Sequence, residues 1–207
     1  MSTNGQLGDV NPSPLLDEND ATLNIGPFSL SFTRNTFNSE KDITAFMKKC
    51  VGIIRQTPEY REWTNYIKDT LGFKNCAFTN ETSDEITIEI HHHPLTLFDI
   101  TTIVLNTFLA NDKEFSSLDI VKDVLLLHFS NKVGFIPIVA SLHEKYHNGF
   151  LIIPPKFIHG DWSYLLNTPG YIIEADTMSK CKQLMDKSNN AHDQYLNWQN
   201  GGMSDVK

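Results

Sequence analysis

Apolar residues recur at helical spacing over residues 43–54 and again over residues 63–71, with polar residues between them. Pro58 stands where the second helix would begin, and Gly72 stands where it would end. The pattern predicts a helical pair within residues 41–75.

The two ends of the chain are more polar. Residues 1–40 are rich in Asn, Asp, Ser, Pro and Gly, a composition typical of a loose arm. Within this arm, residues 25–32 alternate between apolar and polar positions, which predicts one short strand. We expect residues 161–207 to form a small C-terminal extension. The sequence from Ser188 onward is polar and is expected to be frayed.

The middle of the chain, residues 76–160, changes from strand to helix and back. Alternating isoleucines from 86 to 90 predict a strand with one buried face, and two helical segments follow in an insertion at about residues 96–130. A strand or turn and a short helix ending at Asn148-Gly149 come next. The fold class is therefore α+β. Further short strands are expected at residues 73–78, 150–155 and 170–175.

Composition excludes few functions. Of the 207 residues, 40% are hydrophobic, enough for a buried core, and 25 Asp and Glu against 17 Lys and Arg give a net charge of −8. This balance argues against an evenly basic protein that coats nucleic acid. The acid is unevenly placed, however. Residues 76–130 hold nine acidic and two basic groups, residues 41–75 hold four and seven, and residues 131–160 hold one and three.

Cysteine usage and hydropathy indicate a compartment. Cys50, Cys76 and Cys181 are far apart, which argues against a disulfide framework or a CxxC zinc site. No apolar run is long enough to cross a bilayer, and the first residues do not resemble a signal peptide. We therefore expect a cytoplasmic protein without a membrane partner.

Seven of the eight histidines lie between positions 91 and 159, and two groups among them predict a shared metal site. His143 and His147 are four residues apart, so a helix places both imidazoles on one face, where they can bind a single ion. A third ligand can come from the run His91-His92-His93, in which alternate side chains share one face of a strand. The alternative is that both groups are ordinary exposed histidines.

The two groups together resemble the HNH, or ββα-metal, endonucleases, especially the colicin-type DNases. The match rests on the strand sequence EIHH, which begins at Glu89, and on a later helix with an HxxxH pair. The resemblance covers roughly residues 76–150. It implies that His91, His143 and His147 bind one divalent metal ion, which would be Zn, Mg, Mn or Ni.

The same resemblance implies the remaining roles. His92 would be the general base that activates water, and Glu89 would be the carboxylate that supports the site. A helical insertion would lengthen the usual connection between the two strands of the family. Asn131 is the closest candidate for the middle Asn of the family motif. The implied activity is metal-dependent hydrolysis of DNA phosphodiester bonds, with DNA as the partner.

The helix also matches a second family. The sequence HEKYH from His143 to His147 is an HExxH motif, similar to that of the zincin metalloproteases. In that family Glu144 would be the base, and a downstream carboxylate such as Glu174 would be the third ligand. The short predicted helix and the unused EIHHH sequence make this hypothesis weaker than the nuclease.

A third hypothesis is not an enzyme. A protein with an HNH-like core can keep its metal ion for stability after losing the base, and then serve as a structural or interaction module with a protein partner. The Asn- and Lys-rich, cysteine-poor sequence looks phage-like, which adds the virion and the host cytoplasm as locations. We rank the endonuclease first, this metal-binding module second and the protease third.

Overall fold

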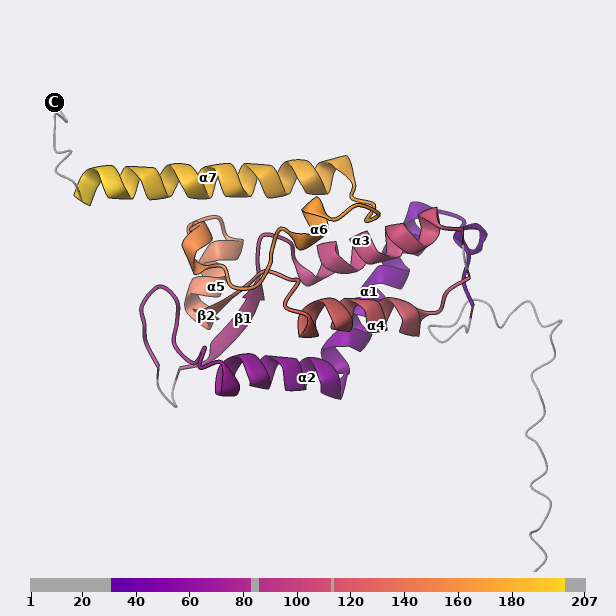
Figure 1. The fold of residues 1–207 in the computed structure, drawn as a ribbon, viewed down its shortest axis with the longest axis horizontal. Coiled ribbons are helices and arrows are strands. Elements are labelled where there is room, and N and C mark those ends of the chain that lie inside the picture. The colour runs from indigo at the N-terminus through magenta and orange to yellow at the C-terminus, as the bar shows by residue number, and fades with distance from the viewer. Residues whose placement is uncertain (1–30, 83–85, 113, 200–207) are drawn as a thin grey trace, which may run out of the picture.

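The computed structural model describes residues 31–82, 86–112 and 114–199, with side chains up to residue 191. It confirms an α+β fold, in which most of the described chain is helical and one small sheet lies beside the helices (Figure 1). The elements are η2 (Arg34–Thr36), α1 (Glu40–Gln56), α2 (Pro58–Asn65), η3 (Tyr66–Thr70), β1 (Ile88–His92), α3 (Leu97–Ala110), α4 (Ser117–Phe129), β2 (Phe135–Val139), α5 (Ala140–His147), η4 (Pro155–Phe157), α6 (Tyr164–Asn167) and α7 (Ala175–Gln199).

Local sequence signals determine where the main helices begin. The Ser39 side chain accepts a hydrogen bond from the Asp42 amide at the start of α1. Helices α3 and α4 each begin with a capping box, in which a hydroxyl residue and the Asp three positions later satisfy each other's backbone amides. The predicted helical pair and both helices of the insertion are therefore confirmed.

The sheet joins two strands that are distant in sequence. β1 and β2 pair antiparallel, with His91 opposite Ile136 and Ile88 opposite Val139. Helices α3 and α4 form the connection between the strands, and α5 follows β2 directly and packs against both strands (Figure 1). The chain thus has the order strand, helical insertion, strand and helix that the apolar pattern and the ββα-metal resemblance indicated.

Two apolar clusters hold these elements together. The larger one runs from Phe32 to Cys181 and includes residues of α1, α3 and α4, with Trp63 and Phe135 among its buried rings. The smaller one consists of Cys76, Ile88, Ile138 and Val139, on the strands and the loop before them. None of the helices in the described residues has the length and hydropathy needed to cross a membrane.

Three of the expected strands are wrong. Residues 73–78, 150–155 and 170–175 form no strand. The first segment meets β2 through a single backbone bond, from the Ala77 amide to the Pro137 carbonyl, and His159 forms only an isolated bridge with Phe135 on the same edge. The expected strand at 25–32 lies almost entirely outside the described residues, although Phe32 forms an isolated bridge with Phe115.

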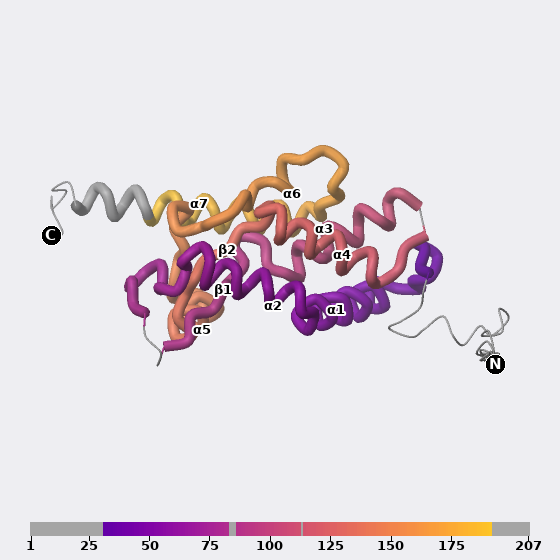
Figure 2. The backbone as a smooth tube through the Cα atoms, turned by 60° about the horizontal axis from the view of Figure 1, so that its bottom comes forward, coloured from indigo at the N-terminus to yellow at the C-terminus, as the bar shows by residue number. Residues whose placement is uncertain are grey.

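The C-terminal extension also differs from the prediction. Instead of fraying from Ser188, the chain continues as α7 to Gln199, and Figures 1 and 2 show this helix running along one side of the molecule. Ser188 is buried and its hydroxyl donates to the Leu184 carbonyl, so this polar residue is accommodated within the helix.

Candidate metal centre

One face of β1 carries polar residues that meet α5. Glu89 and His91 lie two positions apart, so their side chains point to the same side of the strand. The Glu89 carboxylate contacts the His143 imidazole, and the rings of His91 and His143 have centroids 4.5 Å apart. The alternation of the strand thus places a carboxylate and an imidazole under the helix.

Helix α5 brings two further imidazoles to the same point. His143 and His147 are one turn apart, and their Nε2 atoms lie 2.8 Å from each other. One ring nitrogen from each of His91, His143 and His147 can be chosen so that all three lie within 4.8 Å of one another. Zinc–nitrogen bonds are about 2.0–2.1 Å long, so a single ion can reach three nitrogens at this spacing after small shifts.

Glu89 orients the imidazole of His143, which lies between those of His91 and His147 and is the central one of the three. Its Oε2 accepts the Nδ1–H of His143, a contact in which the two side chains are 41% and 26% exposed respectively. When Nδ1 carries the proton, the lone pair of His143 lies on Nε2, the atom that faces His147. A carboxylate that fixes the tautomer of a histidine ligand is a common support in metal sites.

His91 is the buried member of the group. The residue is only 6% exposed, and its Nε2 has no hydrogen-bond partner among the described residues. Burial, together with the nearby charges of His143, His93 and His147, lowers the pKa of His91 from 6.5 to about 3. The imidazole is therefore neutral at pH 7, with a lone pair available for a metal ion.

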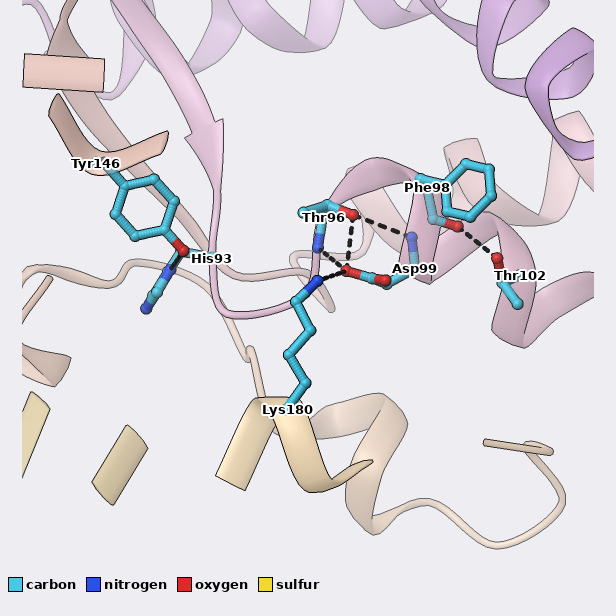
Figure 3. Close-up of polar contacts among 7 residues, drawn as sticks. All are labelled: His93, Thr96, Phe98, Asp99, Thr102, Tyr146 and Lys180. Atoms are coloured by element: carbon cyan, nitrogen blue, oxygen red, sulfur yellow. Dashed lines mark hydrogen bonds and ion pairs between the residues drawn. The ribbon is translucent and has the colours of Figure 1, made fainter. Parts of the chain in front are cut away.

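A hydrogen-bonded pair, His93 and Tyr146, lies beside the three proposed ligands. His93 is 1% exposed, and its Nδ1 lies 3.1 Å from the Tyr146 hydroxyl, which projects from α5 (Figure 3). Burial, and to a lesser extent the charge of Asp99, raises the pKa of Tyr146, so the phenol stays protonated. The pair connects the end of β1 to α5 beside the His91 ring, whose centroid lies 4.7 Å from that of Tyr146.

Helix α7 is tied to the same region through Asp99. This carboxylate accepts from the Thr96 amide and hydroxyl in the capping box of α3, and Lys180 of α7 lies 3.7 Å from it (Figure 3). The ion pair is mostly exposed on the lysine side, so its contribution to stability is small.

The donor set selects among metal ions. Three imidazole nitrogens suit Zn²⁺ and related transition ions, whereas Mg²⁺ prefers oxygen ligands. His147 is exposed and His143 is only half-buried, so the cluster has a solvent side. Three protein ligands with an open position are typical of catalytic zinc sites, while structural sites usually have four. The residues present therefore fit a zinc-like ion with one exchangeable position.

His92 does not join this group, which corrects its assignment as the general base. Its Nε2 lies 2.9 Å from Nε2 of His128, and both residues are buried on the other face of β1. The ring stacks on Trp63, with centroids 5.7 Å apart, and on Tyr60. Strand alternation is the reason, because a residue next to His91 must point the opposite way unless the strand is bulged.

Asn131 is also remote from the role implied for it. It lies in the turn after α4, where its backbone adopts a left-handed conformation with φ 56°. Its amide donates to the His128 carbonyl, and its carbonyl accepts from the Asp161 amide. These contacts make Asn131 a turn residue between α4 and β2, rather than a partner of the imidazoles.

The protease arrangement does not form as expected. Glu144 is exposed on α5, a helix of only eight residues. Glu174, the suggested third ligand, accepts a hydrogen bond from Asn106 instead. The third imidazole beside His143 and His147 comes from β1, as the nuclease resemblance implied.

Sequence reasoning missed the supporting pair of His93 and Tyr146. The alternation of the strand placed His93 on the same face as His91, and it could have favoured His93 over His92. No sequence feature indicated Tyr146, because its contact with His93 depends on how α5 crosses β1.

Comparison with known proteins identifies a family. A family model described as bacteriophage G278-like virion protein matches residues 17–205. Neither the curated proteins nor the solved structures searched give a match. Because the family model covers most of the chain, the protein belongs to the bacteriophage G278-like virion protein family.

Proposed function

We propose that this virion protein binds one divalent transition-metal ion through His91, His143 and His147. The observation that carries the proposal is the convergence of three ring nitrogens within 4.8 Å, beside a carboxylate that fixes the tautomer of the central imidazole. Without an ion, the buried Nε2 of His91 has no partner in the described chain. A buried polar atom without a partner is costly, and a metal ion removes that cost.

The ion would join α5 to β1. Two ligands come from the helix and one from the strand, so a bound ion adds a link between elements that already meet through ring contacts and the Glu89–His143 and His93–Tyr146 hydrogen bonds. A protein in a virus particle has to keep its fold outside the cell, and a metal cross-link of this kind contributes to that stability.

Metal content is the direct test. The purified full-length protein should retain about one equivalent of zinc, and after removal by a chelator it should bind Co²⁺ with the visible absorption of a tetrahedral site. His91→Ala and His147→Ala should abolish that absorption. Lys145→Gln, on the exposed surface of the same helix, is the matched control and should leave it unchanged. A wild-type protein that binds no metal would overturn the proposal.

A second candidate function is hydrolysis of phosphodiester bonds. It is favoured by the strand–strand–helix order, which presents the ligands as the ββα-metal resemblance implies, and by the solvent side of the cluster. A bound divalent ion would supply an activated water and stabilise the charge on the phosphate. The base cannot be His92, because that imidazole lies across the strand against His128.

Nicking of supercoiled plasmid DNA tests this second candidate. The protein is loaded in turn with Zn²⁺, Ni²⁺, Mn²⁺ and Mg²⁺, and activity should disappear in His147→Ala. Since His92 lies outside the cluster, His92→Leu should keep its nicking activity if it folds, which a circular dichroism spectrum checks. Casein serves as the substrate for a parallel test of the protease hypothesis. If the metal-loaded protein cuts neither DNA nor casein, the metal ion serves stability alone.

A further inference from the structure

A hollow of about 350 Å³ lies apart from the proposed metal ligands. It forms where the loop after η3 meets β2 and the segment around η4, and none of the three proposed ligands lines it. A volume near the lower end of the range for ligand sites suits one small organic molecule. The lining residues that matter for its chemistry are Phe73, Asn75, Asn80, Lys156, Phe157 and His159.

Three aromatic rings line the hollow, those of Phe73, Phe157 and His159. Phe73 and His159 are in contact, with ring centroids 4.2 Å apart, and Phe157 packs on Phe78 with centroids 5.0 Å apart. All four rings are only half-buried. Burial lowers the pKa of His159, so its imidazole is mainly a neutral aromatic surface at pH 7. Rings of this kind stack with nucleobases of any sequence, because every base has a π-face.

Two amide side chains stand beside the rings. The Asn75 Nδ2 donates to the Asn80 Oδ1 over 3.1 Å, which fixes the two amides side by side. The backbone N–H of Asn80 also donates to the Cys76 carbonyl, which closes a turn in the loop that carries both side chains. In the described chain no protein group bonds to Asn75 Oδ1 or Asn80 Nδ2. One atom is an acceptor and the other a donor, and each can bond to a polar group on the edge of a base.

The charge of this region suits a phosphate. Among the residues that line the hollow there is no Asp or Glu, and Lys156 carries a positive charge. Lys156 is exposed at the hollow, with its Nζ 5.0 Å from the centroid of the Phe157 ring. An ammonium group beside an aromatic surface can contact a phosphate while the base stacks on the ring.

We propose that this hollow binds a nucleotide, with the base against the aromatic rings and the phosphate at Lys156. The nucleotide is either one unit of a single nucleic acid strand or a free nucleotide, since both offer the same chemistry. The acidic surface elsewhere on the chain disfavours extended contact with a duplex, so the interaction is local. This site does not depend on the proposed metal ion.

Fluorescence anisotropy tests the proposal with the full-length protein and fluorescein-labelled decamers of dT and dA. EDTA is present, so that the metal proposal can fail or succeed independently. Phe157→Ala should weaken binding about tenfold, from the loss of one stacked base. Lys156→Gln should weaken binding. It should also reduce the slope of log affinity against log salt concentration by about one, because one phosphate contact is lost. Calorimetry with dTMP and dAMP then compares free nucleotides with the decamers.

Matched variants separate the site from general effects. Phe150→Ala removes an 82% exposed ring outside the hollow, and Phe157→Tyr keeps the stacking surface, so both should bind as the wild type does. Tighter binding of decamers than of mononucleotides assigns a single strand, whereas comparable affinity assigns a free nucleotide. The proposal is overturned if neither ligand binds at millimolar concentration, or if Phe157→Ala and Lys156→Gln both bind normally.

Discussion

The Nε2 atoms of His92 and His128 lie 2.9 Å apart in the core, on the face of β1 opposite His91. His128 also contacts the Val124 carbonyl through Nδ1, and the Trp63 ring meets both imidazoles. One of the two Nε2 atoms donates to the other, so each satisfies its neighbour. This pair stabilises the fold, and it lies outside the group of proposed ligands.

A double-mutant cycle should show this mutual dependence. His92→Leu alone leaves the Nε2 of His128 buried without a partner, which should cost about 1–3 kcal/mol in the free energy of unfolding beyond the lost packing. The same holds for His128→Leu. The double variant should cost less than the sum of the two single variants. Urea denaturation followed by circular dichroism measures all three, and additive losses would contradict a direct hydrogen bond.

Acid should destabilise the protein through His128. Burial lowers the pKa of this imidazole from 6.5 to about 4, with a smaller opposing effect from its bond to the Val124 carbonyl. The unfolded chain therefore takes up the proton first, and the free energy of unfolding falls as pH decreases from about 6.5 to about 4. The loss at the acid end is about 3 kcal/mol for this residue. Urea midpoints across this range should fall more steeply for the wild type than for His128→Leu.

Metal binding should raise thermal stability. An ion that binds only the folded state at 100 times its dissociation constant adds about 2.7 kcal/mol to the free energy of unfolding. Differential scanning fluorimetry should therefore show a higher Tm with zinc, and EDTA should reverse the increase. His147→Ala should have the same Tm with and without zinc. An equal increase in that variant would place the bound zinc elsewhere.

Glu89→Gln tests the support of His143 without removing a ligand. The amide keeps the shape of the side chain but loses the charge that holds the Nδ1 proton of His143. Metal affinity should fall about 10- to 100-fold, as for other changes to groups that support a ligand. Competition with a chromophoric chelator measures the affinity. Glu144→Gln, on the exposed surface of α5, is the control and should bind metal normally.

Gly134→Ala should be strongly destabilising. A Cβ at this position would collide with the carbonyl of His93 and with the Cβ of Trp162, at the turn into β2. Gly52→Ala is the control, because a Cβ there meets nothing within 4 Å and alanine favours the helix by about 0.5–1 kcal/mol. Chemical denaturation should move the two variants in opposite directions from the wild type.

Much of the fold could be predicted from local patterns. The capping residues and helical spacing of α1, α3 and α4 are short-range features, and each of these helices begins directly after its capping residue, Ser39, Thr96 or Ser116. The i, i+4 spacing of His143 and His147 likewise ensured a shared face on any helix. The pairing of that face with His91 followed from a resemblance and from the strand pattern, and the structure brings the three residues together.

Other features depend on contacts between distant segments. Apolar runs such as residues 150–155 resemble strands, but a strand needs a partner, and backbone groups of β2 that face away from β1 bond to Ala77 and His159 instead. The continuation of α7 past Ser188 was missed because polar spacing suggested fraying. The hollow at Phe157 could not be foreseen, since it joins a loop, a strand and a short helix from separate parts of the sequence.

The sequence by itself determined the local helices, the two-face alternation of β1 and the presence of enough imidazoles for a metal site. Only the tertiary structure decided which helix each histidine side chain packs against. His91 meets α5 and His92 meets α4, because the sheet lies between those helices and adjacent strand residues must face opposite sides. The chemistry of each imidazole therefore depends on what packs against its face, which no single segment of the chain specifies.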